Sequence, residues 1–134
     1  LRVARMSANA LALAEALREA PNVAGVHYPS LPGSAQEDLA RRLLPDGAGG
    51  MLAIHLGGGR AAIQRLLDRF RMVSFAASLA GVETTVSHPE VTSHRYLTPE
   101  ERSALGIHPG TLRISAGIED ADDIIEDFLQ ALSS

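Results

Sequence analysis

Gly110-Thr-Leu-Arg-Ile-Ser-Ala-Gly-Ile-Glu-Asp-Ala-Asp-Asp123 predicts a strand, a turn and the start of a helix in quick succession. Apolar and polar residues alternate through its first half: Leu112, Ile114 and Ala116 alternate with Arg113 and Ser115. Since neighbouring side chains of a strand point to opposite faces, the apolar set is expected to face a core. Arg113 and Ser115 are then expected on the other face.

The second half of this stretch predicts the helix that follows. Gly117 allows the chain to turn, and Asp120 is a candidate N-cap with Asp123 three residues further on. Apolar residues then recur at helical spacing: Ile124, Ile125, Phe128, Leu129 and Leu132. A terminal amphipathic helix is therefore expected to pack on the sheet.

The remaining pattern alternates helices with short strands. Helices are expected over residues 1–20, 35–44, 61–70 and 98–106, and strands over 23–28, 51–56, 72–76 and 82–87. Ser34 is a candidate cap for the second helix, and Thr98 with Glu101 forms a capping box for the fourth. Short turns between the strands favour an α+β fold: a mostly antiparallel sheet of four or five strands with helices packed on one face.

Composition limits the function classes. The 134 residues suit one domain with one core, and no apolar run approaches the ~20 residues of a membrane span. A net charge of -4 with few aromatics argues against nucleic-acid binding. The absence of cysteine excludes disulfides and thiolate sites and makes the cytoplasm the expected location. All twelve basic residues are arginine, so no lysine can form a Schiff base.

Three weaker signals each have a plain structural interpretation. Gly57-Gly-Gly-Arg60 could hold a phosphate, but it lacks a Gly-Lys-Ser/Thr ending and is better explained as a turn into a helix. Five histidines show no metal-binding spacing, so no metal site is predicted. The acidic cluster of Asp120, Asp122, Asp123, Glu126 and Asp127 fits the dipole at a helix N-terminus better than a cation site.

Several separate motifs resemble the C-terminal part of the Cys/Met-metabolism PLP-dependent enzymes, which include cystathionine gamma-synthase, cystathionine gamma-lyase, methionine gamma-lyase and O-acetylhomoserine sulfhydrylase. The motifs are Ser78-Leu-Ala-Gly-Val-Glu-Thr-Thr-Val-Ser-His-Pro89, Ser93-His94, Thr98-Pro-Glu-Glu-Arg-Ser-Ala-Leu-Gly-Ile107 and residues 112–123. Asn9-Ala-Leu-Ala-Leu-Ala-Glu15, Val26-His-Tyr-Pro-Ser-Leu-Pro32 and Gly49-Gly-Met-Leu-Ala-Ile54 fit the same enzymes. The resemblance covers essentially the whole chain.

The resemblance implies that residues 1–134 form the small C-terminal domain of a fold-type-I PLP enzyme. The helix over about residues 1–20 would lead in from a large domain outside this chain, which would hold PLP and its Schiff-base lysine. The resemblance assigns the substrate's α-carboxylate to Arg113 and places Ser78 beside that carboxylate and the lysine. Ala80 stands where the family usually has glycine, so the sequence departs from the family's pattern in the turn after Ser78.

Arg113 has competing interpretations. On spacing alone, a solvated strand arginine is favoured; the resemblance favours a carboxylate-binding residue instead. The chain would then be part of a carbon–sulfur lyase or transsulfuration enzyme that acts on sulfur-containing amino acids. The chain is expected to be inactive alone, and the full enzyme is expected to be a homo-oligomer, a tetramer. The alternatives are a non-enzymatic amino-acid-binding module and a dimerisation module.

The residue before Ser78 bears on substrate choice. Ala77 has no charge to offer, whereas cystathionine-handling members of the family carry an acidic residue at this position for the distal ammonium group. The resemblance therefore implies a methionine gamma-lyase-like preference. Elimination versus replacement, and chemistry at the β or the γ carbon, stay open.

Overall fold

A five-stranded sheet organises the computed structural model, which describes residues 1–133. The strands lie in the order β1, β2, β5, β4, β3, and their bounds are Val23–His27, Met51–Leu56, Thr111–Ser115, Thr85–Ser87 and Ser74–Phe75 respectively. The β1–β2, β2–β5 and β5–β4 pairs are antiparallel, and the β4–β3 pair is parallel. The expected α+β fold is confirmed, with a mixed sheet in place of a purely antiparallel one.

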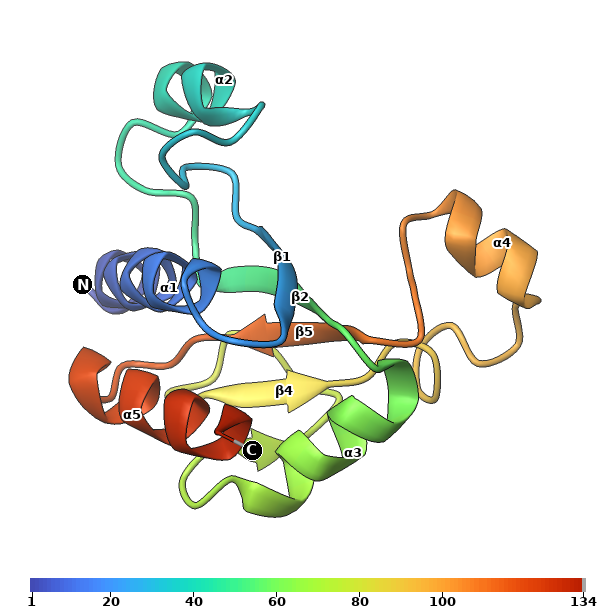
Figure 1. The fold of residues 1–134 in the computed structure, drawn as a ribbon. Helices are drawn as coiled ribbons and strands as arrows, with labels where there is room; N and C mark the ends of the chain where they lie inside the picture. Colours follow the sequence, from blue (N-terminus) through green and yellow to red (C-terminus); the bar gives the residue numbers. More distant parts are fainter. Residues whose placement is uncertain (134) are drawn as a thin grey trace.

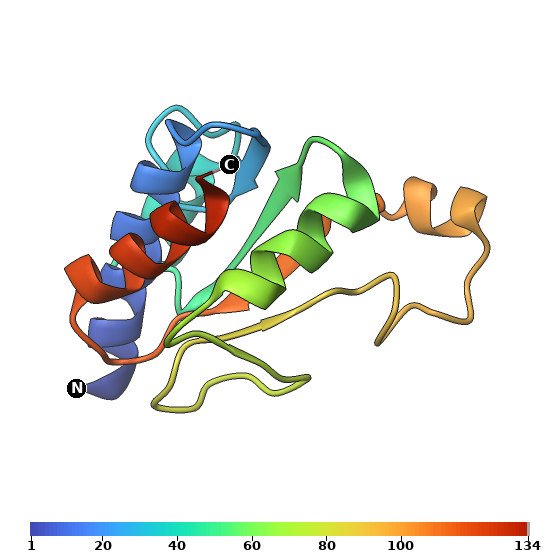
Figure 2. The ribbon, with the colours of Figure 1, turned by 60° about the horizontal axis from the view of Figure 1, so that its bottom comes forward.

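Three long helices cover one face of the sheet (Figures 1 and 2). They are α1 (Arg2–Arg18), α3 (Gly59–Arg69) and α5 (Ala121–Leu132), with α5 in contact with both of the others. Because strand residues alternate, one side of each strand meets these helices. The core comprises Leu13, Leu17, Ile54, Ile63, Leu66, Leu112, Ile114, Ile124 and Phe128, among others.

Two short helices stand away from this layered body (Figure 1). They are α2 (Glu37–Leu43) and α4 (Pro99–Ala104), and each lies in a long connection between strands. The capping box of α4 is present, since Thr98 accepts from the Glu101 N–H and Glu101 accepts from the Thr98 N–H. No helix within residues 1–133 is long and apolar enough to cross a membrane.

The predictions around residues 72–87 are the least accurate. The two expected strands shorten to β3 and β4, which run parallel because residues 76–84 form a wide loop and not a tight turn. Val82 leaves the sheet because its carbonyl accepts a hydrogen bond from the Ile118 N–H. Both residues of β3 are exposed, at the edge of the sheet.

Two helices begin at residues other than those expected from the sequence. Ser34 does not cap α2: its hydroxyl accepts from the Gln36 N–H in the preceding turn, and Gln36 becomes the N-cap. α3 begins at Gly59, because Gly58 adopts a φ of 89° that favours glycine, so the tight-turn interpretation of the glycine run is supported. Leu129, expected in the apolar stripe of the terminal helix, is exposed.

β2 and β5 lie next to each other near the middle of the sheet and position the candidate site. β2 buries Leu52, Ile54 and Leu56 against the helices, while its other face is half-buried. On β5 that second face carries Thr111, Arg113 and Ser115. The loop 76–84 covers the Ser115 end, which leaves Ser115 only 2% exposed.

Candidate functional site

Arg113 lies at the centre of β5, on the face opposite the helices. Its neighbours across the sheet are Ala53 of β2 and Ser87 of β4. Nη2 donates a 3.0 Å hydrogen bond to the carbonyl oxygen of Ser78, whereas Nε is buried and has no hydrogen-bond partner within residues 1–133. A buried donor left unpaired costs about 1–3 kcal/mol. The guanidinium group therefore retains donor capacity for an acceptor from outside this part of the chain.

The structure brings Ser78 to Arg113 although 35 residues separate them in the sequence. The contact uses the carbonyl of Ser78 and not its hydroxyl, and the same carbonyl accepts a 3.3 Å hydrogen bond from Thr85 Oγ1. Ser78 and Ala77 are both exposed. The hydroxyl of Ser78 and the methyl of Ala77 therefore lie on an accessible loop beside the arginine.

The loop adopts an unusual backbone at Ala80. This residue has a φ of 59°, in the left-handed region, where an L-residue other than glycine is strained by about 1–2 kcal/mol. Its N–H donates a 3.0 Å hydrogen bond to Ser115 Oγ. The position at which the sequence departs from the usual glycine is thus the strained one, and a side chain of β5 holds it.

A cavity of about 660 Å³ opens beside Arg113, within the 300–1,000 Å³ typical of small-molecule sites. Its walls come from β1, β2 and the segment 28–36, and Arg113 contributes a charge. The lining residues are Val26, His27, Tyr28, Pro29, Ser34, Ala35, Gln36, Met51, Leu52, Ala53 and Arg113. The cavity therefore combines apolar walls with a cation that can bind an anionic group.

Tyr28 has a structural role in this wall. Its hydroxyl lies 2.7 Å from the carbonyl oxygen of Gly49 and 3.3 Å from that of Ser7. Burial raises the pKa of the phenol, and its hydrogen-bond partners offset only part of that increase. Tyr28 therefore stays neutral and joins the segments around the cavity.

Three histidines gather at one edge of the same sheet face, which their sequence spacing did not reveal. The ring of His55 lies 4.8 Å from that of His27 and 5.2 Å from that of His108, and its Nδ1 is 2.8 Å from Thr111 Oγ1. Burial, followed by the two neighbouring histidines, lowers the pKa of His55. Within residues 1–133, no group of three histidine or acidic side chains is arranged to hold a metal ion.

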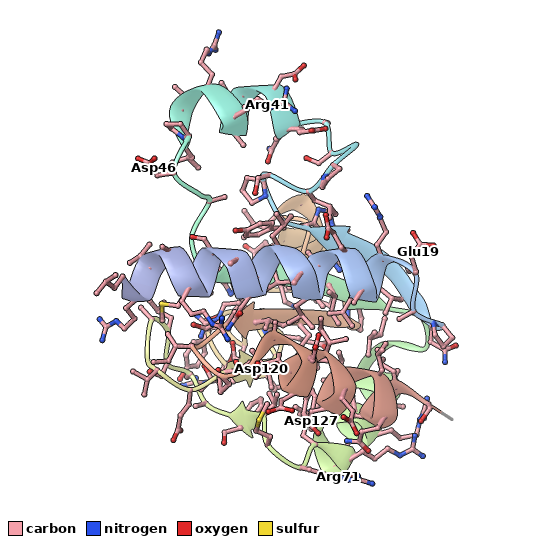
Figure 3. The ribbon with its side chains drawn as sticks, turned by 90° about the vertical axis from the view of Figure 1, so that its left-hand side faces the viewer. Glu19, Arg41, Asp46, Arg71, Asp120 and Asp127 are labelled. Atoms are coloured by element: carbon pink, nitrogen blue, oxygen red, sulfur yellow. The ribbon has the colours of Figure 1, made fainter. Side chains whose placement is uncertain are left out.

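The helix-dipole interpretation is wrong for Asp127. Only Asp122 and Asp123 lie in the first turn of α5, capped by Asp120, whereas Asp127 is buried further along. Asp127 accepts hydrogen bonds from the backbone N–H groups of residues 71–73 (Figure 3). The sequence held a signal for this, because position 127 falls on the buried stripe between Ile124 and Ala131.

Comparison with known proteins gives a consistent result. The family model described as "Cys/Met metabolism PLP-dependent enzyme" matches residues 1–133. The chain is 40% identical to an O-succinylhomoserine sulfhydrylase of Pseudomonas aeruginosa and 42% identical to an L-methionine gamma-lyase of Pseudomonas putida. Each match covers 100% of this chain and 33% of the relative, so the chain spans about a third of the length of these proteins.

Solved structures agree with the fold. A cystathionine gamma-lyase from Micromonospora echinospora superposes with a TM-score of 0.90 at 39% identity, over 99% of this chain and 34% of that one. A putative O-acetylhomoserine (thiol)-lyase from Campylobacter jejuni gives 0.93 at 32% identity, over 99% and 32%. The latter structure contains a pyridoxyl-lysine monophosphate residue.

Proposed function

The chain belongs to the Cys/Met metabolism PLP-dependent enzymes, and from this premise we propose that it is the C-terminal, substrate-binding domain of a carbon–sulfur lyase or sulfhydrylase acting on sulfur amino acids. The family is PLP-dependent, and the relatives include both sulfhydrylases and methionine gamma-lyases. Because the chain spans a third of those relatives, the complete activity belongs to a longer parent enzyme.

The observation that carries this proposal is the incomplete pairing of Arg113. One guanidinium nitrogen is tethered to the Ser78 carbonyl, while Nε is buried without a partner within residues 1–133. A planar guanidinium can form two parallel charge-assisted hydrogen bonds to a carboxylate. In the proposed role, Arg113 binds the α-carboxylate of the substrate and fixes its orientation.

Ser78 is proposed as the second substrate contact. Its exposed hydroxyl can donate to the same carboxylate or accept a hydrogen bond from a neighbouring group. Its carbonyl accepts a hydrogen bond from Arg113, so the serine and the arginine are in direct contact. Two donors, one from β5 and one from the loop 76–84, would then fix the substrate by its carboxylate end.

The chain does not supply the attachment point of the cofactor. It contains no lysine, so the amine that would hold PLP must come from the remainder of the parent enzyme, and Ser78 would lie beside it. When bound, PLP supplies an electron sink that stabilises negative charge developing on the substrate. We therefore propose that the 134-residue chain alone is inactive; a longer reading frame without an active-site lysine would favour the non-enzymatic alternative.

Replacement of Arg113 in the parent enzyme tests this role. Arg113→Ala should lower kcat/KM for amino-acid substrates by about 30-fold to several-thousand-fold, equivalent to roughly 2–5 kcal/mol. Arg113→Lys should be nearly as damaging, because it keeps the charge and loses the fork geometry. Wild-type kcat/KM in the alanine variant would contradict the role.

Ala77 carries the proposal about substrate choice. Its methyl group offers no partner for a distal ammonium group, and a buried unpaired charge is penalised. We therefore propose that the parent enzyme prefers methionine-like substrates over cystathionine. The kcat/KM values for L-methionine and L-cystathionine should favour methionine in the wild type and shift toward cystathionine in Ala77→Glu; a wild type that strongly prefers cystathionine would contradict this.

Assembly follows from the same resemblance. We propose a cytoplasmic homotetramer for the parent enzyme, in which further protein covers the apolar side chains that this chain exposes. Leu39, Leu43 and Leu44 are exposed on and just after α2, which stands away from the sheet (Figure 1). Sedimentation of the parent enzyme would show the assembly, and a strict monomer would contradict it.

A further inference from the structure

Two segments far apart in the sequence run alongside each other next to the Arg113 site. One is the end of β5 with the turn that follows it, residues 115–119; the other is the second half of the loop 76–84. Ser115 Oγ accepts from the Ala80 N–H at 3.0 Å, and the Ile118 N–H donates to the Val82 carbonyl at 2.9 Å. The second half of the loop that carries Ser78 is therefore held by the end of β5 and the turn that follows it.

Glu119 forms the last and strongest part of this attachment. Its carboxylate accepts from the Thr84 N–H at 2.5 Å and from the Thr84 hydroxyl at 2.9 Å. The same hydroxyl oxygen accepts from the Gly117 N–H at 3.0 Å. Thr84 is only 1% exposed, so these bonds lie where water competes poorly. Hydrogen bonds to a charged acceptor are stronger than those between neutral groups.

Helix α1 fixes the segment that carries Glu119. Asn9, itself 2% exposed, donates from Nδ2 to the carbonyls of Gly117 and Glu119 at 3.0 and 2.9 Å. Arg5 donates to the Glu119 carbonyl at 3.0 Å. These bonds connect the position of Glu119 to the helix layer and not to the loop alone.

Gly117 shows how closely the two segments approach. A Cβ atom at this position would lie 2.3 Å from the Val82 carbonyl oxygen and 2.4 Å from Glu119 Oε2. Such distances are far inside van der Waals contact, so only glycine fits here. The turn after β5 is thus shaped to bring Glu119 onto Thr84.

We propose that Glu119 is a positioning residue, which sets the place of Ser78, and with it the Arg113 guanidinium, through its hold on Thr84; this rests on the proposed carboxylate role of Arg113 and Ser78. The backbone of Ala80 is strained, so the loop is expected to change conformation when the bond between Glu119 and Thr84 is lost. Any such relaxation moves the Ser78 carbonyl to which Arg113 is bonded. Substrate binding then depends on a carboxylate that does not touch the substrate.

Glu119→Gln in the parent enzyme tests this proposal. The substitution replaces one carboxylate oxygen, an acceptor, with an amide NH2 group, a donor, which faces the N–H and hydroxyl donors of Thr84. The expected loss in kcat/KM for amino-acid substrates is about tenfold. Glu126→Gln is the matched control, because Glu126 lies on the exposed surface of α5; it should change little. In an Arg113→Ala background, which removes the bond to the Ser78 carbonyl, the Glu119 effect should shrink to about twofold, since Glu119 is proposed to act through that contact. Equal losses in both backgrounds, or a loss no larger than that of Glu126→Gln, would overturn the proposal.

A second readout separates this proposal from the carboxylate role. In the 134-residue chain, Glu119→Gln should speed amide hydrogen exchange at Thr84 and Ala80, and Glu126→Gln should not. Unchanged exchange would overturn the attachment itself, whereas faster exchange together with a silent Arg113→Ala would overturn only the carboxylate role. If Glu119→Gln fails to fold, Thr84→Val removes the hydroxyl, which donates to Glu119 and accepts from the Gly117 N–H, and keeps the backbone N–H of residue 84. This variant should speed the same exchange and lower kcat/KM by a smaller factor, and failure to do either would overturn the proposal.

Discussion

Asp127 and Arg113 are two charged side chains that differ in how fully the chain satisfies their hydrogen bonds. Asp127, 5% exposed, accepts three backbone hydrogen bonds of 2.8–2.9 Å from residues 71–73 and a fourth bond of 2.9 Å from Gln130 Nε2. Arg113 makes one bond to Ser78, and its buried Nε makes none within residues 1–133. A charged group whose hydrogen bonds are all made within the chain stabilises the fold, whereas a charged group with an unpaired donor is available to bind a ligand.

The largest expected effect on stability comes from Asp127→Ala. The change leaves three backbone N–H groups without their acceptor, and the one at Val73 is buried. It should lower the free energy of unfolding by about 3 kcal/mol in a urea titration. Arg113→Ala should cost less than about 1 kcal/mol, because it removes a donor that is already unpaired. Equal costs for the two variants would break the comparison.

Acid should weaken the Asp127 anchor in a predictable direction. Burial alone would raise the pKa of this carboxyl, but the hydrogen bonds from Val73, Arg71, Met72 and Gln130 outweigh it and lower the pKa below its usual 3.8. A depressed folded-state pKa means that the stabilisation is fully present above the unfolded-state pKa and is lost as the pH falls through the folded-state one. Unfolding free energies measured from pH 6 to pH 2.5 should therefore fall less steeply in Asp127→Asn than in the wild type; parallel curves would contradict the anchor.

The smallest expected effect concerns the loop on the Arg113 side. Ala80→Gly should raise the free energy of unfolding by about 0.5–1 kcal/mol, because glycine adopts a φ of 59° without strain. Ala77→Gly, at an exposed position of the same loop where φ is not positive, is the matched control and should be neutral or slightly destabilising. If Ala80→Gly destabilised the protein more than this control, the loop would not be strained.

Periodicity in the sequence predicted most of the fold because the elements concerned are held by local forces. The apolar stripe of residues 1–20, the capping box at Thr98 and the alternation around Arg113 each depend on neighbours within a few residues. They correspond to α1, α4 and β5 in the structure. The face on which Arg113 lies follows from the same alternation.

Features that depend on distant partners were not predictable in this way. Val82 looks like a strand residue but bonds to Ile118, and Ser115 looks exposed until the loop 76–84 covers it. Glu119 looks like a solvated charge before a helix, yet it binds Thr84, 35 residues earlier. Each outcome is decided by a tertiary hydrogen bond that local spacing does not encode.

The central claim is that Arg113 binds the α-carboxylate of the substrate, and a matched ligand pair tests it most directly. Inhibition constants of an unreactive L-amino acid and of its carboxamide should be measured in the parent enzyme, in Arg113→Ala and in Asp127→Asn. The wild type and Asp127→Asn should prefer the carboxylate by about tenfold or more, since a charge-assisted pair is lost with the amide. In Arg113→Ala the preference should vanish; an undiminished preference in that variant would contradict the assignment.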